Sequence, residues 1–522
     1  MTRVKILVMV LLYARIVSAA EKSNFTFSVA YGPHAVGFRA VHHYDYTRSY
    51  KRVDAEGNVI AGERARPIQT LIWYPAQAVA GTKPMLFGRY LDLMTTEDDF
   101  TPLTTQERAV KLKALLEANY IAKNFERERV QLTKAVEDAH PQTGSFPVVI
   151  YAPSLSGSAF ENADLCEYLA SYGFVVLSSP SLGLHSRSMT WDLEGIEAQV
   201  GDIEFLVGYG RGIPQADPAH IAVAGWSWGG MTNVFAALRD SRIQALVSLD
   251  GALRYQPARM KEGESVGLID ANKLTAPLLY ISSQPYTLEE LNQLNSTLKI
   301  DNAYNFLNEL KYNDTYLMQS SEMIHSGFSS LFIRFREDQY FTDYSAAEFS
   351  ENYSWMARYV LQFLRGYLNN DAAARQFLKN DPERNSVPPH LFKMDVREAL
   401  HPAANIPDFA RELATQGFDK ATEIYQRAKK SDPNFKLPEH DLNTWGYELL
   451  GSGKASKAIA VFHLNAAMHP ESANTYDSLA EAQEAAGDKQ GAIVNYHKSL
   501  SLNDQNQHAL ARLKELEAGK TQ

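Results

Sequence analysis

The fold of this chain is decided by one ten-residue stretch, Ile221-Ala222-Val223-Ala224-Gly225-Trp226-Ser227-Trp228-Gly229-Gly230. Its first four residues form an apolar run typical of a buried strand, and a helical pattern runs from residue 230 to 238. Between them stands Gly-x-Ser-x-Gly, a pattern that gains its meaning from this strand–turn–helix context. The turn is so tight that the serine takes a strained backbone angle, and its hydroxyl points out at the carboxyl end of the sheet. The sequence therefore predicts Ser227 as a nucleophile, with an incidental serine in a tight turn as the alternative.

Apolar runs and helical patterns alternate from about residue 25 to residue 370. The runs are nearly continuous, as in strands whose two faces are both covered. They span residues 68–74, 146–151, 173–177, 221–224, 245–249 and 277–281. Helical patterns such as residues 162–172 and 232–238 lie between them. This order predicts an α/β architecture, a mostly parallel, doubly wound sheet with helices on both faces.

A serine hydroxyl is a weak nucleophile until a neighbouring base takes its proton. In folds with this type of turn, the acid and then the histidine follow the serine along the chain. Of the 14 histidines, six precede the serine, six lie in the C-terminal helical region, and His390 follows the last helix expected in the first region. His325 remains, in a loop after a short expected strand at residues 316–319. We expect it to be the base, with a surface-loop histidine as the alternative.

The acid must lie between the serine and the histidine. Several glutamates and five aspartates do so, namely Asp240, Asp250, Asp270, Asp301 and Asp314. Asp250 directly follows the apolar run 245–249, which places it at the carboxyl edge of the strand after that of the nucleophile. The next run leads into Ser282-Ser283-Gln284, which contains no acid. We therefore expect Asp250 to be the acid, with a loop-capping aspartate as the alternative.

Acyl transfer also needs hydrogen-bond donors for the negatively charged oxygen of the tetrahedral intermediate. One donor is the backbone amide of the residue after the nucleophile, here Trp228, and the other comes from a loop after an earlier strand. That loop follows the run 146–151, and its candidate donor is Leu155.

Several segments resemble one family of α/β-hydrolases. They are residues 32–37, residues 146–149, residues 165–174, the turn at Ser227, Leu249-Asp250, and His325 with Phe328. Over residues 28–370 the chain is similar to the platelet-activating-factor acetylhydrolase group, including bacterial dienelactone-hydrolase-like relatives. The resemblance implies ester hydrolysis, with the acid at Asp250. The chain departs from the family at Pro153-Ser154, where the family's oxyanion loop has His-Gly, and at Trp226, where the family often has histidine.

The chain repeats itself beyond residue 395 with a period of 34 residues. Seven pairs match at this spacing: Leu442 and Tyr476, Trp445 and Leu479, Gly446 and Ala480, Gly453 and Gly487, Ala458 and Ala492, Phe462 and Tyr496, and Pro470 and Asp504. The period resembles that of the tetratricopeptide repeat. A looser copy lies upstream, at Gly417, Ala421, Tyr425 and Pro433. We expect an all-α array that binds a protein or self-associates, with an unrelated helical bundle as the alternative.

The first twenty residues have the composition of a secretory signal peptide. Arg3 and Lys5 precede an apolar run at residues 6–14, and small residues follow at 17–19. The run is too short to span a membrane, and a buried first strand or an uncleaved anchor is the alternative. The protein is therefore expected to be secreted or periplasmic.

Composition excludes several classes of protein. A single cysteine, Cys166, excludes internal disulfides and cysteine-rich metal sites, and its apolar helical setting favours a core position over a nucleophile. The formal charge of −10 gives no electrostatic drive for nucleic-acid binding. No metal or organic cofactor is expected.

Together these patterns predict three regions: a signal peptide at 1–20, an α/β-hydrolase domain at 21–385 with a helical insert at about 85–142, and tetratricopeptide repeats at 395–522. A second insert is expected at 287–309. The expected activity is that of a secreted serine hydrolase, a carboxylic-ester hydrolase that acts on a small-molecule ester through an acyl-enzyme. The alternative is a catalytically weak or inactive hydrolase-fold scaffold whose repeats bind a protein partner.

Overall fold

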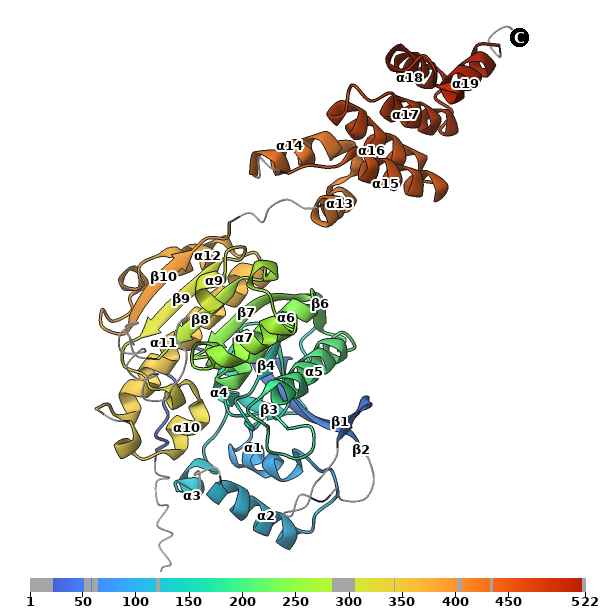
Figure 1. The fold of residues 1–522 in the computed structure, drawn as a ribbon. Coiled ribbons are helices and arrows are strands. Elements are labelled where there is room, and N and C mark those ends of the chain that lie inside the picture. Colours follow the sequence, from blue (N-terminus) through green and yellow to red (C-terminus); the bar gives the residue numbers. More distant parts are fainter. Residues whose placement is uncertain are drawn as a thin grey trace, which may run out of the picture. The chain divides into compact units, whose positions relative to one another are not determined.

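The structure, a computed structural model, describes residues 22–50, 58, 64–118, 123–283, 306–341, 343–400, 406–431 and 435–518. The predicted signal peptide and most of the second expected insert lie outside the described residues. The chain divides into two compact units, Met1–Ala399 and Leu400–Gln522 (Figure 1). Among the described residues, no helix combines the length and apolar character needed to cross a membrane.

The first unit is built on one ten-stranded sheet with the order β10-β9-β8-β7-β6-β4-β5-β2-β1-β3. Its strands are β1 (Ala35–Tyr50), β2 (Arg64–Ala76), β3 (Ala135–Glu137), β4 (Phe146–Ala152), β5 (Val175–Ser178), β6 (Ala216–Trp226), β7 (Ile243–Leu249), β8 (Leu278–Ser282), β9 (Thr315–Ser320) and β10 (Phe392–Arg397). From β5 through β4, β6, β7 and β8 to β9, neighbouring strands are parallel. The pairs β2–β5, β1–β2 and β9–β10 are antiparallel, so the sheet is mixed towards both edges.

Helices cover both faces of this sheet. The helices of the unit are α1 (Gly88–Leu93), α2 (Thr105–Ala118), α3 (Phe125–Glu128), α4 (Ala163–Ser171), α5 (Leu193–Gly210), α6 (Trp228–Arg239), α7 (Pro257–Ser265), α9 (Phe306–Glu309), α10 (Ser330–Phe335), α11 (Ala346–Leu368) and α12 (Ala372–Lys379). Along β4 the side chains alternate: Val149 and Tyr151 join a core with α4 and α11, whereas Val148 and Ile150 join another with α5 and α6. This two-sided burial explains why the central strands are continuous apolar runs. The predicted α/β-hydrolase fold, a mostly parallel sheet wound on both faces, is confirmed.

The helical insert joins the core and the sheet edge. It contains α1, α2 and α3, and it ends in β3, which pairs in parallel with β1. Tyr90 and Leu91 of α1 are buried in the core that contains α4 and α11. The insert is therefore part of the first unit's core.

The boundary after the sheet differs from the one expected from the sequence. The sequence ends the first region at residue 385 and begins the repeats at 395, yet β10 occupies Phe392–Arg397 and pairs with β9. The compact unit accordingly extends to Ala399. β10 lies at the edge of the sheet and alternates apolar with charged residues, so its sequence has no apolar run to reveal it.

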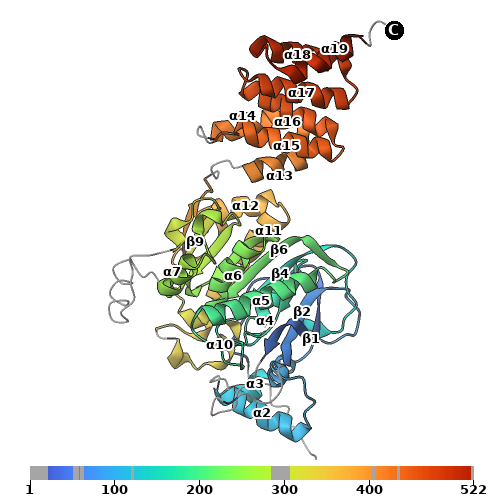
Figure 2. The ribbon, with the colours of Figure 1, turned by 45° about the vertical axis from the view of Figure 1, so that its right-hand side comes forward.

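The second unit consists of helices. They are α13 (Ile406–Gln416), α14 (Ala421–Ser431), α15 (Glu439–Gly451), α16 (Ala455–Met468), α17 (Ala473–Ala485), α18 (Lys489–Leu502) and α19 (Gln507–Ala518) (Figure 2). Both α15 to α17 and α16 to α18 are displaced by the 34 residues read from the sequence. A Cβ atom on Gly446 would lie 2.3 Å from Cε1 of Phe462, so a small residue there permits α15 and α16 to pack closely. Gly453 and Gly487 have φ values of 73° and 85°, which glycine adopts readily at the turn of each helix pair.

Candidate active site

Ser227 stands alone between the last residue of β6 and the first residue of α6. Its φ and ψ are 56° and −116°, a strained conformation for a residue other than glycine. Two glycines permit the turn: a Cβ on Gly225 would lie 2.4 Å from the carbonyl carbon of Gly229, and a Cβ on Gly229 would lie 2.0 Å from the carbonyl oxygen of Ala152. Both obstacles are backbone atoms, so they have little freedom to move aside. The sequence motif thus forms the sharp turn expected of it.

His325 lies within hydrogen-bond distance of both expected partners. Its Nε2 is 2.9 Å from Oγ of Ser227, and its Nδ1 is 2.7 Å from Oδ2 of Asp250. Because the carboxylate only accepts, the neutral imidazole carries its proton on Nδ1 and leaves Nε2 free to accept one from the serine. Trp226 Nε1 donates to the carbonyl oxygen of His325 at 2.9 Å, which ties the histidine loop to the residue before the serine. The structure brings the three expected residues together.

Asp250 is completely buried at the carboxyl end of β7. Its Oδ1 accepts hydrogen bonds from the hydroxyl of Tyr255 at 2.9 Å and from the backbone amide of Ser283 at 3.0 Å. Burial and the charge of Asp250 raise the pKa of Tyr255 well above its ordinary value, so the hydroxyl remains protonated and donates. The sequence did not indicate Tyr255 or Ser283 as partners of the acid, since neither belongs to the Gly-x-Ser-x-Gly pattern or to the order of its partners.

The two expected oxyanion donors are the backbone amides of Trp228, at the start of α6, and of Leu155, in the turn after β4. Trp228 is the first residue of α6, and the amides of the first helical turn have no acceptor within the helix. Leu155 lies in the turn after β4, which is closed by a bond from the amide of Gly157 to the carbonyl oxygen of Ser154. The contact of Gly229 with Ala152 brings the end of β4 beside the start of α6.

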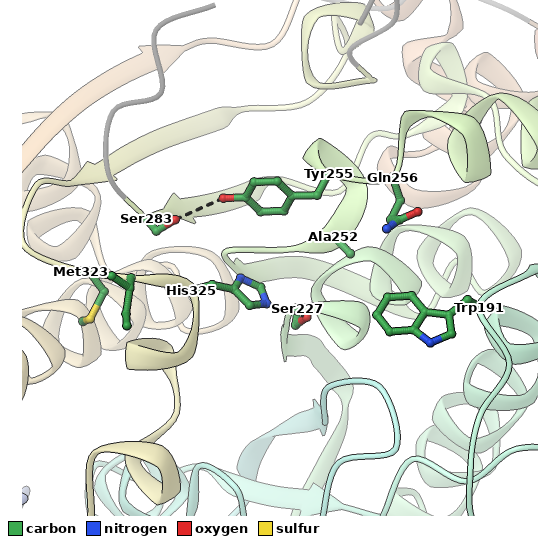
Figure 3. Close-up of a pocket in the computed structure, with 9 residues that line it drawn as sticks. Trp191, Ser227, Ala252, Tyr255, Gln256, Ser283, Met323 and His325 are labelled. Carbon is green, nitrogen blue, oxygen red and sulfur yellow. Dashed lines mark hydrogen bonds between the residues drawn. The ribbon is translucent and has the colours of Figure 1, made fainter. Parts of the chain in front are cut away.

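A cavity of about 310 Å³ opens over the serine and the histidine. Most of its wall is apolar, with Tyr255 and Ser283 above the histidine and Trp191 on the far side of Ser227 (Figure 3). It is further lined by Ala252, Gln256, Met323 and Ile324. Leu155 does not line it. A second cavity of about 190 Å³ contains Leu155 together with Trp226, Glu161 and Arg336.

No group of three or more His, Cys, Asp or Glu side chains arranged to hold a metal ion occurs in the part of the chain that the structure describes. Cys166 is buried in α4, in the core position that its helical setting favours.

Solved structures with a similar arrangement of elements are known. No protein-family model matches the sequence, and no curated protein matches it. A ferulic acid esterase from Streptomyces cinnamoneus aligns in structure with 18% sequence identity and a TM-score of 0.44. The alignment covers 66% of this chain and 93% of the esterase chain.

Proposed function

We propose that this protein is a serine hydrolase that cleaves carboxylic esters through an acyl-enzyme. The observation that carries the proposal is the unbroken chain of short contacts from Ser227 Oγ through His325 to buried Asp250, at 2.9 and 2.7 Å. Three such groups in this order and geometry have few structural uses, whereas each has a defined role in acyl transfer.

In the proposed reaction, His325 Nε2 takes the hydroxyl proton as Ser227 Oγ attacks the ester carbonyl. Asp250 orients the imidazole and stabilises its cationic form. The amides of Leu155 and Trp228 bind the oxygen that becomes negative. His325 then gives the proton to the departing alcohol, and a water molecule, activated by the same histidine, releases the acid and restores the serine.

The cavity beside Ser227 supports a small-molecule ester as the substrate. Its volume of about 310 Å³ and its largely apolar wall suit an acyl or alcohol group of limited size. We further propose that the protein is exported, by the signal peptide predicted at residues 1–20, and that the helical unit is a tetratricopeptide-type array for a protein partner or for self-association.

Labelling with a fluorophosphonate probe tests the enzyme proposal. Wild type is expected to be labelled, Ser227→Ala is expected to remain unlabelled, and Ser265→Ala, which alters an exposed serine of α7, is expected to behave as wild type. Hydrolysis of p-nitrophenyl esters should follow the same order. An unlabelled wild type would favour the scaffold alternative, in which the repeats carry the function.

A further inference from the structure

The turn that contains Leu155 is held by hydrogen bonds to a buried glutamate, Glu161. Glu161 Oε1 accepts a hydrogen bond from the amide of Ser154 at 2.8 Å, and Oε2 accepts one from the hydroxyl of Ser154 at 2.7 Å. The carboxylate leaves no room beside the turn, since a Cβ on Gly157 would lie 2.5 Å from Oε2. Glu161 therefore fixes both the main chain and the side chain of the residue before Leu155.

The residue after Leu155 is fixed as well. The hydroxyl oxygen of Ser156 accepts from the amide of Met189 at 2.8 Å, and its carbonyl oxygen accepts from Arg187 at 3.1 Å. Ser156 has a φ of 55°, which these bonds help to maintain. The peptide of Leu155 is thus clamped on both sides, and the clamp on the Ser154 side depends on one carboxylate.

We propose that Glu161 is a positioning residue, whose carboxylate holds Ser154 so that the Leu155 amide is presented to the oxyanion. This inference rests on the proposed function. It also fits the departure at Pro153-Ser154, because the serine in place of the family's glycine adds a hydroxyl donor to the backbone amide that either residue would supply.

The pKa of Glu161 lies near neutral pH. Burial raises its pKa to about 7, against the hydrogen bonds from Ser154 and Tyr151, which lower it. The other ionisable groups around it include Glu97, which raises the pKa further, Arg187, which pairs with Glu97, the buried thiol of Cys166, and Arg336, which lines the same cavity. All three hydrogen bonds donate to the carboxylate, so protonation weakens the hold on Ser154.

Glu161 must then be unprotonated for full activity. The acid side of the wild-type kcat profile is expected to include a step near pH 7 from the protonation of Glu161. Glu161→Gln keeps the shape of the side chain without its charge and resembles the protonated state at every pH. We expect its kcat above neutral pH to fall about 10-fold with KM little changed, and we expect the step that Glu161 adds to the acid side to be absent.

Glu167→Gln is the matched control. Glu167 lies in α4, six residues after Glu161, and is also buried with a pKa raised to about 7, but it accepts from the hydroxyl of Tyr90 and the amide of Lys134, away from the turn. This variant is expected to keep the kcat and the pH profile of wild type, including the step near pH 7. A second variant, Ser154→Ala, removes one donor from the Glu161 carboxylate, so its acid side should move to higher pH.

The measurements are kcat and KM for p-nitrophenyl acetate across the pH range, with fluorophosphonate labelling of each variant. The inference is overturned by an acid side in Glu161→Gln with the same shape as that of wild type, by wild-type kcat in Glu161→Gln, by an equal loss in Glu167→Gln, or by no upward shift in Ser154→Ala. Labelled, active wild type in any of these cases leaves the proposed function intact. Unlabelled, inactive wild type overturns the proposed function, and this inference with it.

Discussion

The hydroxyl of Tyr255 donates a hydrogen bond to Oδ1 of Asp250 at 2.9 Å, while Oδ2 of the same carboxylate faces Nδ1 of His325 at 2.7 Å. The two bonds hold opposite oxygens, so the tyrosine sets the rotation of the carboxyl group that orients the histidine. The tyrosine oxygen also accepts a hydrogen bond from Ser283 Oγ, 3.1 Å away, which fixes the position of the tyrosine (Figure 3).

Tyr255→Phe removes that donor without changing the shape of the ring. A hydrogen bond to a charged group contributes about 1.5–3 kcal/mol, so we expect kcat/KM for a p-nitrophenyl ester to fall about 10-fold or more. Tyr359→Phe is the control, since Tyr359 is a buried tyrosine of α11 whose hydroxyl meets Asn385 outside the pocket. Equal activity of Tyr255→Phe and wild type would show that the two remaining partners suffice to orient Asp250.

The turn at Ser227 depends on Gly229, which offers a direct test of the fold around the site. Gly229→Ala places a methyl group against the carbonyl oxygen of Ala152, where the available distance is 2.0 Å. We expect a strong loss of thermal stability and of fluorophosphonate labelling. Gly208→Ala is the control, because Gly208 lies in α5 with no atom within 4 Å of the added Cβ. That variant should gain up to about 1 kcal/mol from the better helix propensity of alanine.

Much of the site was accessible from the sequence because its signals are local or ordered along the chain. Ser227 lies in a motif whose glycines are required by backbone contacts within a few residues. His325 and Asp250 follow from the order of partners and from the apolar run that ends at Leu249, since β7 is buried on both faces. The central strands are buried on both faces, so they form the continuous apolar runs by which the sequence predicts them.

The residues that hold the catalytic groups in position could not be predicted from the sequence in this way. Glu161 reaches Ser154 across a turn, and Tyr255 reaches Asp250 from the loop after β7, so their roles appear only when side chains are placed in space. Strand β1 escaped notice for a related reason. Its second half is largely exposed and polar, and it exists as a strand through long antiparallel pairing with β2. Such pairing is a property of two distant segments, and only β2 contains an apolar run, at residues 68–74.

Because the pKa of Glu161 is raised in the folded protein, the free energy of unfolding should depend on pH. Its pKa is about 7 in the folded protein, against an ordinary value of 4.5, so burying its charge makes the folded state less stable. This cost is absent below about pH 4.5, grows as the pH rises, and is complete above about pH 7. Glu161→Gln removes it, so the variant should exceed wild type in free energy of unfolding by about 2–3 kcal/mol at pH 8.

Calorimetry of both proteins at pH 5 and at pH 8 checks this sign, because the difference should shrink towards acid pH. A variant less stable than wild type at pH 8 would show that the hydrogen bonds of the carboxylate outweigh the cost of burying it. Together with the expected loss of kcat, a gain in stability would mark Glu161 as a residue retained for function.

The close packing of α15 against α16 can be tested by adding a methyl group at Gly446. In Gly446→Ala the new methyl group would meet the ring of Phe462, with its nearest atom at 2.3 Å, so we expect a loss of about 1–3 kcal/mol. Faster amide hydrogen exchange in these two helices measures the loss locally. Gly451→Ala, at the end of the same helix with no atom within 4 Å, should leave exchange close to that of wild type. Unchanged protection in Gly446→Ala would contradict the observed packing.

Trp191 supplies an exposed aromatic wall to the cavity over Ser227. Its side chain is 60% exposed, and its ring stands edge to face against Trp228 with a centroid distance of 5.7 Å. An apolar group of a bound ester can cover this ring and remove it from water. We expect Trp191→Ala to lower kcat/KM about fivefold for esters with a bulky apolar group, mainly through KM, because an aromatic contact contributes about 0.5–1.5 kcal/mol.

A comparison of small and bulky esters distinguishes substrate contact by Trp191 from an effect of Trp191 on the catalytic groups. Methyl acetate is too small to reach the ring, so its kcat/KM should stay at the wild-type value in Trp191→Ala. Tyr46→Ala, which removes an exposed aromatic ring that does not line the cavity, should leave both substrates unaffected. An equal fall for small and bulky esters would instead mean that Trp191 acts through its contact with Trp228, the residue whose amide is expected to bind the oxyanion, and the wall of the cavity would then not determine substrate size.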